Sequence, residues 1–125
     1  MIQTQSKKSQ EQERVLTMAV IRASEKLGLS GKDLAMIIGV SEATVSRMRK
    51  DAFWLKKGTK EFELGAYFVR FFRSLDTLTG GNGQVAYAWL RNDNRVFGGP
   101  PLDQIKTISG MIHGLAYLDS RRAPL

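Results

Sequence analysis

The chain has 125 residues, 42% of them hydrophobic, and its 19 lysines and arginines outnumber 12 aspartates and glutamates to give a net charge of +7. This length supports one moderate core or two small ones, and no run of about 18 apolar residues is present to span a membrane. The absence of cysteine argues against disulfides and thiolate metal sites. We therefore expect a protein of a reduced, bacterial cytoplasm.

The N-terminal residues 1–12 are rich in Gln, Ser and Lys and lack the apolar segment of a signal peptide. This composition predicts a disordered start. Apolar residues with helical spacing follow over residues 14–27 and stop at Gly28. They predict the first helix of a folded unit that spans residues 13–58.

Residues 29–50 have the pattern of a helix-turn-helix, in which two short helices cross around a small apolar centre. Gly39 stands where the chain must reverse, and glycine adopts the positive φ of such a turn without steric cost. Ser30 and Ser41 are placed to cap the two helices, and Asp33 follows Ser30 with the spacing of a capping box. The side chains expected to form the apolar centre are Leu34, Ile38, Val40, Val45 and Met48.

The second of these helices is the candidate DNA-reading element, because recognition helices meet base edges through their N-terminal residues. The expected base readers are Ser41, Glu42, Ala43, Thr44, Ser46 and Arg47. Contacts to phosphates are expected from Lys32, Arg49, Lys50, Lys56 and Lys57. The alternative interpretation is an ordinary amphipathic helix pair with a solvated charged face.

The distribution of charge favours DNA binding by this part of the chain. Residues 1–60 contain 12 basic and 6 acidic side chains, whereas residues 61–125 contain 7 and 6. The net positive charge is therefore concentrated in the half that holds the helix-turn-helix, as expected for a protein that binds a polyanion.

Residues 59–79 predict a connecting helix that is hydrophobic on more than one face. Part of this surface is expected to be a dimer interface formed by Phe68, Phe71 and Phe72, since helix-turn-helix proteins commonly bind two half-sites with two copies. Burial of the same side chains inside the monomer is the alternative. The preceding aromatics Phe53 and Trp54 are expected to clasp two subdomains, with stacking on nucleic acid as the alternative.

The C-terminal segment, residues 80–125, opens with Gly80-Gly81-Asn82-Gly83, which ends the helix but lacks the flanking features of a phosphate-binding loop. A short helix closes at Trp89-Leu90, and residues 92–99 must then form a tight surface loop. Pro101 suits the first turn of a following helix. A loop held at both ends is either a structural connector or a binding epitope.

The run from Ala86 to Ile105, with Trp89-Leu90, Asn94, Gly98-Gly99 and Pro101-Leu102 as its most specific parts, resembles the C-terminal domain of Xre/MbcA/ParS-like antitoxins. Together with the helix-turn-helix, the resemblance covers about residues 15–120. It implies an all-α protein in which an N-terminal helix-turn-helix bundle precedes a small helical toxin-binding domain.

The same resemblance implies a cognate toxin with a RES domain that consumes NAD⁺, whose active site the antitoxin covers while its other half represses the shared operon. Homodimers inside a larger toxin–antitoxin complex are expected. The residues carried over to toxin binding are Arg91, Asn92, Asn94, Gly98, Gly99, Pro101, Leu102, Arg121 and Arg122. For the last two, at the basic C-terminal tail, a frayed and solvated end is the alternative.

Catalysis has little support in the sequence. His113 is the single histidine, stands on an apolar helix and lacks a partner arranged as base or orienter, so we expect it to be a structural or interface residue. No enzyme activity, cofactor or metal is expected. Two functions remain: an antitoxin that binds both operator DNA and a toxin, or a stand-alone dimeric repressor.

Overall fold

The computed structural model describes residues 6–122, and this part of the chain folds into seven α-helices with no strand. The all-α prediction is therefore confirmed. The helices are α1 (Lys7–Lys26), α2 (Gly31–Ile38), α3 (Glu42–Arg49), α4 (Lys60–Leu78), α5 (Gly83–Arg91), α6 (Pro101–Gln104) and α7 (Ile108–Arg122).

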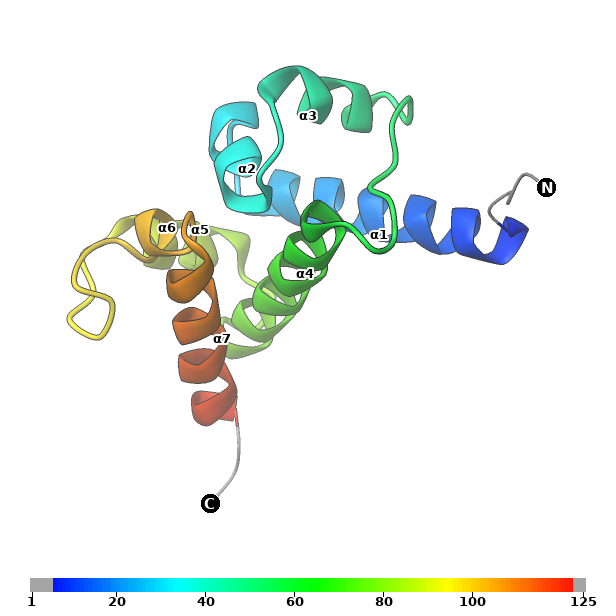
Figure 1. Cartoon of the computed structure of the whole chain (residues 1–125). Coiled ribbons are helices and arrows are strands. Elements are labelled where there is room, and N and C mark those ends of the chain that lie inside the picture. Colours follow the sequence, from blue (N-terminus) through cyan, green and yellow to red (C-terminus); the bar gives the residue numbers. More distant parts are fainter. Residues whose placement is uncertain (1–5, 123–125) are drawn as a thin grey trace.

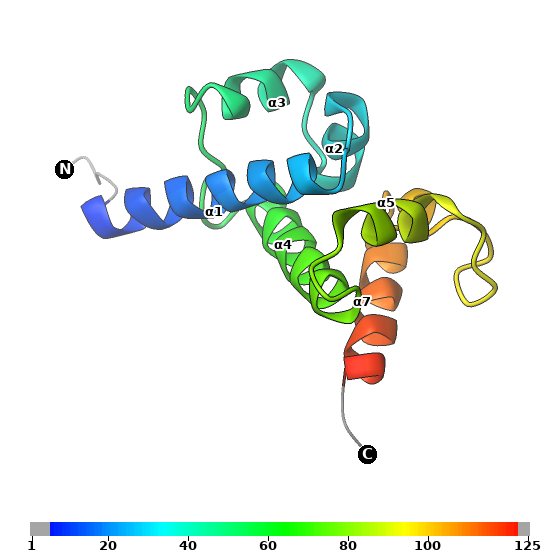
Figure 2. The same ribbon diagram turned by 180° about the vertical axis from the view of Figure 1, so that it is seen from behind.

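Helix α4 connects the two halves of the molecule. Helices α1, α2 and α3 form one layer, α4 descends from beneath α1, and α7 packs along its lower part with α5 and α6 beside it (Figures 1 and 2). The N-terminal half of α1 projects beyond the rest of the fold in both views. Within residues 6–122, none of the helices has the length and hydropathy needed to cross a bilayer.

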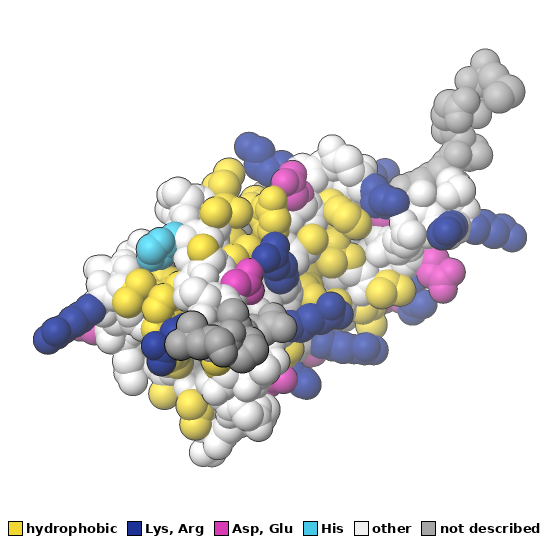
Figure 3. Space-filling view, turned by 90° about the horizontal axis from the view of Figure 1, so that it is seen from below, with side chains coloured by type: hydrophobic (Ala, Val, Ile, Leu, Met, Phe, Trp, Pro, Cys, Tyr) yellow, Lys and Arg dark blue, Asp and Glu magenta, His cyan; other side chains and the backbone are white. Residues whose placement is uncertain are grey.

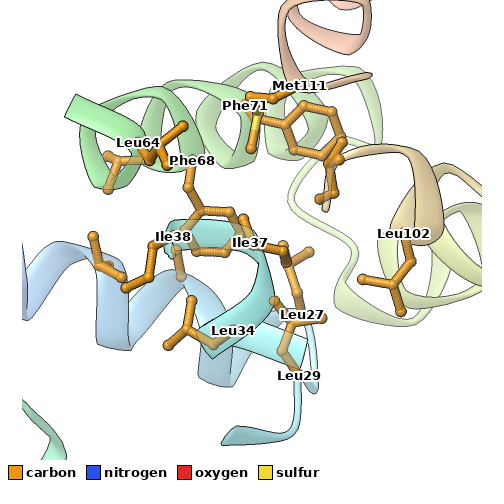
Figure 4. Packing of buried hydrophobic residues seen from close by; sticks show 14 of the residues in the cluster. Leu27, Leu29, Leu34, Ile37, Ile38, Leu64, Phe68, Phe71, Leu102 and Met111 are labelled. Carbon is orange, nitrogen blue, oxygen red and sulfur yellow. The ribbon is translucent and has the colours of Figure 1, made fainter. Parts of the chain in front are cut away.

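The hydrophobic core is continuous from the helix-turn-helix to the C-terminal helices. Phe68 points toward Ile37 and Ile38 of α2, whereas Phe71 lies beside Met111 of α7 (Figure 4). Both phenylalanines are fully buried within one chain. The prediction that they form a dimer surface is therefore wrong, because α4 needs two apolar faces to hold both halves of its own chain.

Phe72 differs from these two, since it is half-buried and its ring lies 5.8 Å from the Lys26 amine. The side chain is thus partly covered by α1 of the same chain. Its placement offers little free surface to a second copy.

Helix α1 begins earlier than expected. Ser6 caps it by accepting a hydrogen bond from the Ser9 amide, and helix continues from Lys7. The predicted disorder is wrong for residues 7–12, because Glu13 and Thr17 on the same helix accept the Lys57 and Leu55 amides at 2.8 Å and so fasten α1 to the segment before α4. Residues 1–5 of the predicted disordered start lie outside the described residues.

The two halves also meet through polar contacts near the α1–α2 turn. The Arg91 guanidinium stacks 3.5 Å from the Tyr87 ring centroid and donates to the carbonyl oxygens of Leu27 and Gly28. Lys106 pairs with Asp33 at 3.0 Å, and both side chains are largely shielded from solvent. The C-terminal helices are therefore fixed against α1 and α2 rather than tethered by a linker.

Candidate functional site

The helix-turn-helix has the local geometry that its sequence predicts. Ser30 and Ser41 accept the amides of Asp33 and Thr44 at 3.0 Å, and Gly39 adopts a φ of 77° in the turn. The Asp33 carboxylate pairs with Lys106, so the capping-box spacing serves a contact between the two halves. Of the predicted apolar centre, Val40 is half-buried, and the fully buried members are Leu34, Ile38, Val45 and Met48.

Helix α3 presents a polar outer face while Val45 and Met48 point into the core. The predicted base readers that are exposed on this face are Glu42, Ala43, Ser46 and Arg47, with Ser41 just before them. The helix lies on the side of α1 away from α4, at the edge of the molecule (Figure 1). Its position leaves the whole polar face accessible to a DNA duplex.

Three of the predicted base readers also have intramolecular contacts. The Ser41 hydroxyl caps α3 and lies 2.9 Å from the Thr44 hydroxyl. Thr44 is half-buried and accepts a hydrogen bond from the Arg47 guanidinium at 3.1 Å. Arg47 further lies 5.9 Å from the Phe53 ring. The structure thus orients Arg47, the side chain best suited to a guanine edge, before any ligand binds.

All of the predicted phosphate contacts are exposed, and they surround the helix-turn-helix. Lys32 lies at the start of α2, whereas Lys57 donates to the Gln12 side chain at 2.6 Å beside the projecting half of α1. The remaining three, at the end of α3 and in the segment that follows, are Arg49, Lys50 and Lys56.

The segment after α3 is fastened by Asp51, which sequence reasoning did not single out. Its carboxylate accepts the Arg14 guanidinium at 2.8 Å and the Trp54 indole at 2.7 Å. The hydrogen bond from Arg14 is the largest cause that holds the pKa of the Asp51 carboxyl below its ordinary value. Asp51 also has a φ of 58°, a conformation that a short polar side chain tolerates.

Phe53 and Trp54, which the sequence predicts to clasp two subdomains, lie in this segment and are half-buried. Leu55 is buried in the core, and Trp54 is held by Asp51. The one signal for Asp51 in the sequence is its place directly after the recognition helix, where a short polar residue tolerates the positive φ with which the chain leaves the helix.

The second candidate site is the loop of residues 92–99, which projects away from the helices (yellow in Figure 1). Asn94 closes it: its amide donates to the Gly99 carbonyl at 3.1 Å, and its carbonyl accepts the Gly98 amide at 3.0 Å. The Asn94 side chain accepts the Val96 amide at 3.0 Å. Gly98 has a φ of 72°, which explains a glycine at this place in the turn.

Phe97 anchors the loop to the C-terminal helices. Its buried ring packs edge-on against Trp89 at 5.6 Å and Tyr117 at 5.4 Å between ring centroids. His113 packs on the same ring and lies 3.3 Å from the Val96 carbonyl. The loop therefore has a fixed base and an exposed tip at Arg95 and Val96. Sequence reasoning missed Phe97, although a lone aromatic among turn residues is a usable signal.

The structure separates the predicted toxin-binding residues into three groups. Asn92 and Gly98 are exposed on the loop, while Asn94 and Gly99 are half-buried at its closure. Pro101 and Leu102, the first two residues of α6, are buried, so their placement on a binding surface is wrong. Arg91 is half-buried, and its guanidinium donates to the carbonyl oxygens of Leu27 and Gly28, directly after α1.

The predicted basic tail is helical at least to Arg122. Arg121 is exposed in the last turn of α7, and Asp119 accepts the Arg70 guanidinium at 2.7 Å. Residues 119–122 are thus part of α7, and the ion pair between Asp119 and Arg70 joins this last turn to α4. The side chain of Arg122 and the whole of residues 123–125 lie outside the described residues.

Nothing in the described part of the chain brings together three or more side chains that could hold a metal ion. His113 is exposed, packs on the Phe97 ring and lies 3.3 Å from the Val96 carbonyl oxygen.

These features define a class: a helical protein that joins a DNA-reading helix-turn-helix to a second helical unit with a projecting loop. Comparison with family models gives two matches, the antitoxin Xre-like helix-turn-helix domain over residues 8–70 and the antitoxin Xre/MbcA/ParS C-terminal toxin-binding domain over residues 74–123. The chain therefore belongs to the Xre/MbcA/ParS-like antitoxins, which are not an enzyme family. A comparison with curated proteins gave no match.

Proposed function

We propose that this antitoxin neutralises a RES-type, NAD⁺-consuming toxin by covering its active site with the loop of residues 92–99. The observation that carries the proposal is the rigid presentation of this loop within the matched toxin-binding domain. Phe97 fixes its base, and Arg95 and Val96 remain exposed at its tip. A preorganised loop loses little conformational entropy when it enters a pocket.

We further propose that the chain represses its own operon as a homodimer. The exposed polar face of α3 and the surrounding basic side chains support DNA binding. Dimers place two such helices on two half-sites. Base contacts would come from Glu42, Ala43, Ser46 and Arg47. Ser41, which caps α3, and Thr44, whose amide it accepts, would lie near the DNA backbone at the start of the helix.

Co-expression with the protein encoded by the adjacent gene tests the antitoxin function. Induction of a RES-type toxin alone should deplete cellular NAD⁺ and stop growth, and co-expression of this chain should restore both. Purification of the pair should yield a stable complex. If the chain neither binds that protein nor restores NAD⁺ while it still binds its promoter DNA, the stand-alone repressor takes the place of the antitoxin.

A further inference from the structure

A groove of about 810 Å³ lies between the projecting half of α1 and the later part of α4. Within residues 6–122, no element covers this surface (Figures 1 and 2). Viewed from below, hydrophobic side chains gather between the two chain ends with basic side chains around them (Figure 3). The apolar lining of the groove comes from Val15, Leu16, Ala19, Ala66 and Val69.

The two walls of the groove have the pattern of helix faces that pack on a further helix. The lining residues recur at intervals of three or four residues, from Lys8 to Ala19 on α1 and from Ala66 to Thr77 on α4. Each face extends over about three turns, or about 17 Å. Ala19 and Ala66 are small, so a third helix can approach both walls closely. Val15, at 62% exposure, is available as its main apolar contact.

The rim of the groove is basic on both walls. Lys8 on α1 and Arg73 on α4 are exposed, and neither charged group has a hydrogen bond or ion pair to any of residues 6–122. Arg70, the other arginine of the α4 wall, pairs with Asp119 at 2.7 Å. Each wall therefore offers one cation without a partner in the described part of the chain.

Glu11 is the one acidic side chain among the described residues that line the groove. Arg14 follows it by three residues on the same helix and lies outside the lining. The hydrogen bond and charge of Asp51 and, to a lesser extent, the charge of Glu11 raise the pKa of the Arg14 guanidinium. The charge of Glu11 is thus partly balanced from outside the groove, and the groove keeps a net positive charge.

We propose that the groove binds an acidic amphipathic helix of another protein. The apolar face of that helix packs on α1 and α4, and its acidic side chains lie beside Lys8 and Arg73. Apolar burial over three turns supplies affinity, while opposite charge at both walls favours acidic helices over basic ones. The proposal does not depend on the functions proposed above.

The page of the sequence and the charges of the walls argue against occupation by this chain itself. Residues 1–5 and 123–125 are each shorter than the three helical turns that the groove accommodates. A second copy that laid its α1 on the α4 wall would bring Lys8 towards Arg73, so like charges would face each other. A separate, acidic partner fits the groove better than either.

The groove lies apart from both candidate sites. It opens on the side of α1 where α4 lies, whereas α3 lies on the other side and the loop of residues 92–99 projects from the C-terminal helices (Figures 1 and 2). A helix in the groove therefore leaves the DNA-reading face and the loop accessible. Through this third surface, another protein can bind the chain while it is on DNA or in complex with the toxin.

Fluorescence anisotropy with labelled synthetic peptides tests the assignment on the full-length chain. The probe is a peptide of about 18 residues, or five helical turns, with a leucine stripe flanked by glutamates. One control peptide has lysines in place of the glutamates, and the other has the residues of the probe in an order without a stripe. The parent protein should bind the acidic peptide and should bind each control at least about tenfold more weakly.

Substitutions locate the bound peptide. Val15→Asp removes an apolar contact and adds a repelling charge, so the acidic peptide should bind about tenfold more weakly, with unchanged helical content by circular dichroism. Val85→Asp, at a valine of α5 that is 49% exposed, is the matched control and should bind like the parent. The double variant Lys8→Glu, Arg73→Glu should prefer the lysine peptide. Arg70 is left unchanged because it bonds to Asp119.

Competition with duplex DNA distinguishes the groove from the DNA-reading face, which also has basic side chains around it. A saturating duplex should leave the acidic peptide bound. Displacement of the peptide by DNA would place it on the DNA-reading face and overturn the proposal.

The remaining outcomes are equally decisive. Equal binding of the acidic and lysine peptides, unchanged binding by Val15→Asp, or no binding of the acidic peptide overturns the acidic-helix site. In the last case, light scattering that gives the parent twice the chain mass of 14.0 kDa and Val15→Asp the mass of one chain assigns the groove to a second copy instead. Toxin neutralisation is measured separately through NAD⁺, so its failure is not confused with any of these results.

Discussion

Arg47 shows how single contacts prepare the DNA-reading face. Thr44 accepts a hydrogen bond from its guanidinium, and the Phe53 ring centroid lies 5.9 Å from the guanidinium carbon. Such restraint lowers the side-chain entropy that binding must otherwise remove. Asp51 prepares the same face from the other end of α3, because it holds the following segment against α1 through Arg14.

Substitution of Arg47 should separate sequence reading from general DNA affinity. Arg47→Ala is expected to cost about 1–3 kcal/mol on the operator and to relax preference at one base position, as for a lost bidentate contact. Lys32→Ala, at an exposed lysine of α2, should weaken specific and random duplexes alike and reduce the salt dependence. Equal losses from both variants on operator and random DNA, in titrations at several salt concentrations, would contradict these roles.

The Asp51 contact predicts a pH dependence of stability. Because the folded-state pKa lies below the ordinary value of 3.8, the carboxylate stabilises the fold above about pH 4, and this contribution is lost as the pH falls through the lowered pKa. Asp51→Asn keeps a residue that tolerates the positive φ but removes the charge. Its melting temperature should be lower than the parent's at pH 7, and the difference should shrink below about pH 4. A constant difference across this range would contradict the account.

Elements whose signals are local were predictable from the sequence. The caps and Gly39 of the helix-turn-helix act within a few residues, so spacing alone placed α2 and α3. The partners of α4 were not predictable, because an aromatic stripe has the same pattern whether it packs on its own chain or on another. Pro101 and Leu102 show the same ambiguity, because a motif shared with a binding domain contains buried residues that stabilise the fold as well as exposed residues that bind the partner. The sequence predicted a loop at residues 92–99, but it did not identify Phe97 as the side chain that anchors this loop.

Loss of that anchor should affect the loop and leave the DNA-reading face intact. Phe97→Ala removes a buried ring from three aromatic contacts and should lower the free energy of unfolding by about 3–5 kcal/mol in urea titrations. Binding of the toxin should weaken, while operator binding persists at temperatures where the variant is folded. Val96→Ala, at the exposed tip, is the control and should change stability by less than about 0.5 kcal/mol. A similar small loss for Phe97→Ala would contradict the role of the anchor.

At the scale of the whole molecule, α4 packs against the helices of both candidate sites but contributes no residue to either site. The helix-turn-helix and the C-terminal helices share its two apolar faces, and Arg91 and Lys106 fasten them further. A fragment that begins near Lys60 would expose Leu64 and Phe68, so point substitutions in the full chain separate the functions more cleanly than truncation does. The two sites nevertheless lie at different ends of the fold (Figure 1).

The most direct test of two separate sites on one chain is a growth and reporter assay in cells that express the adjacent toxin. Arg47→Ala should protect the cells and lose repression of the operon reporter. Val96→Asp should repress and fail to protect, whereas Val85→Asp, the same change at an equally exposed valine, should do both. If Val96→Asp still protects, or if either Arg47→Ala or Val96→Asp loses both activities while its melting curve is unchanged, the assignment of DNA reading to α3 and toxin binding to the loop is contradicted.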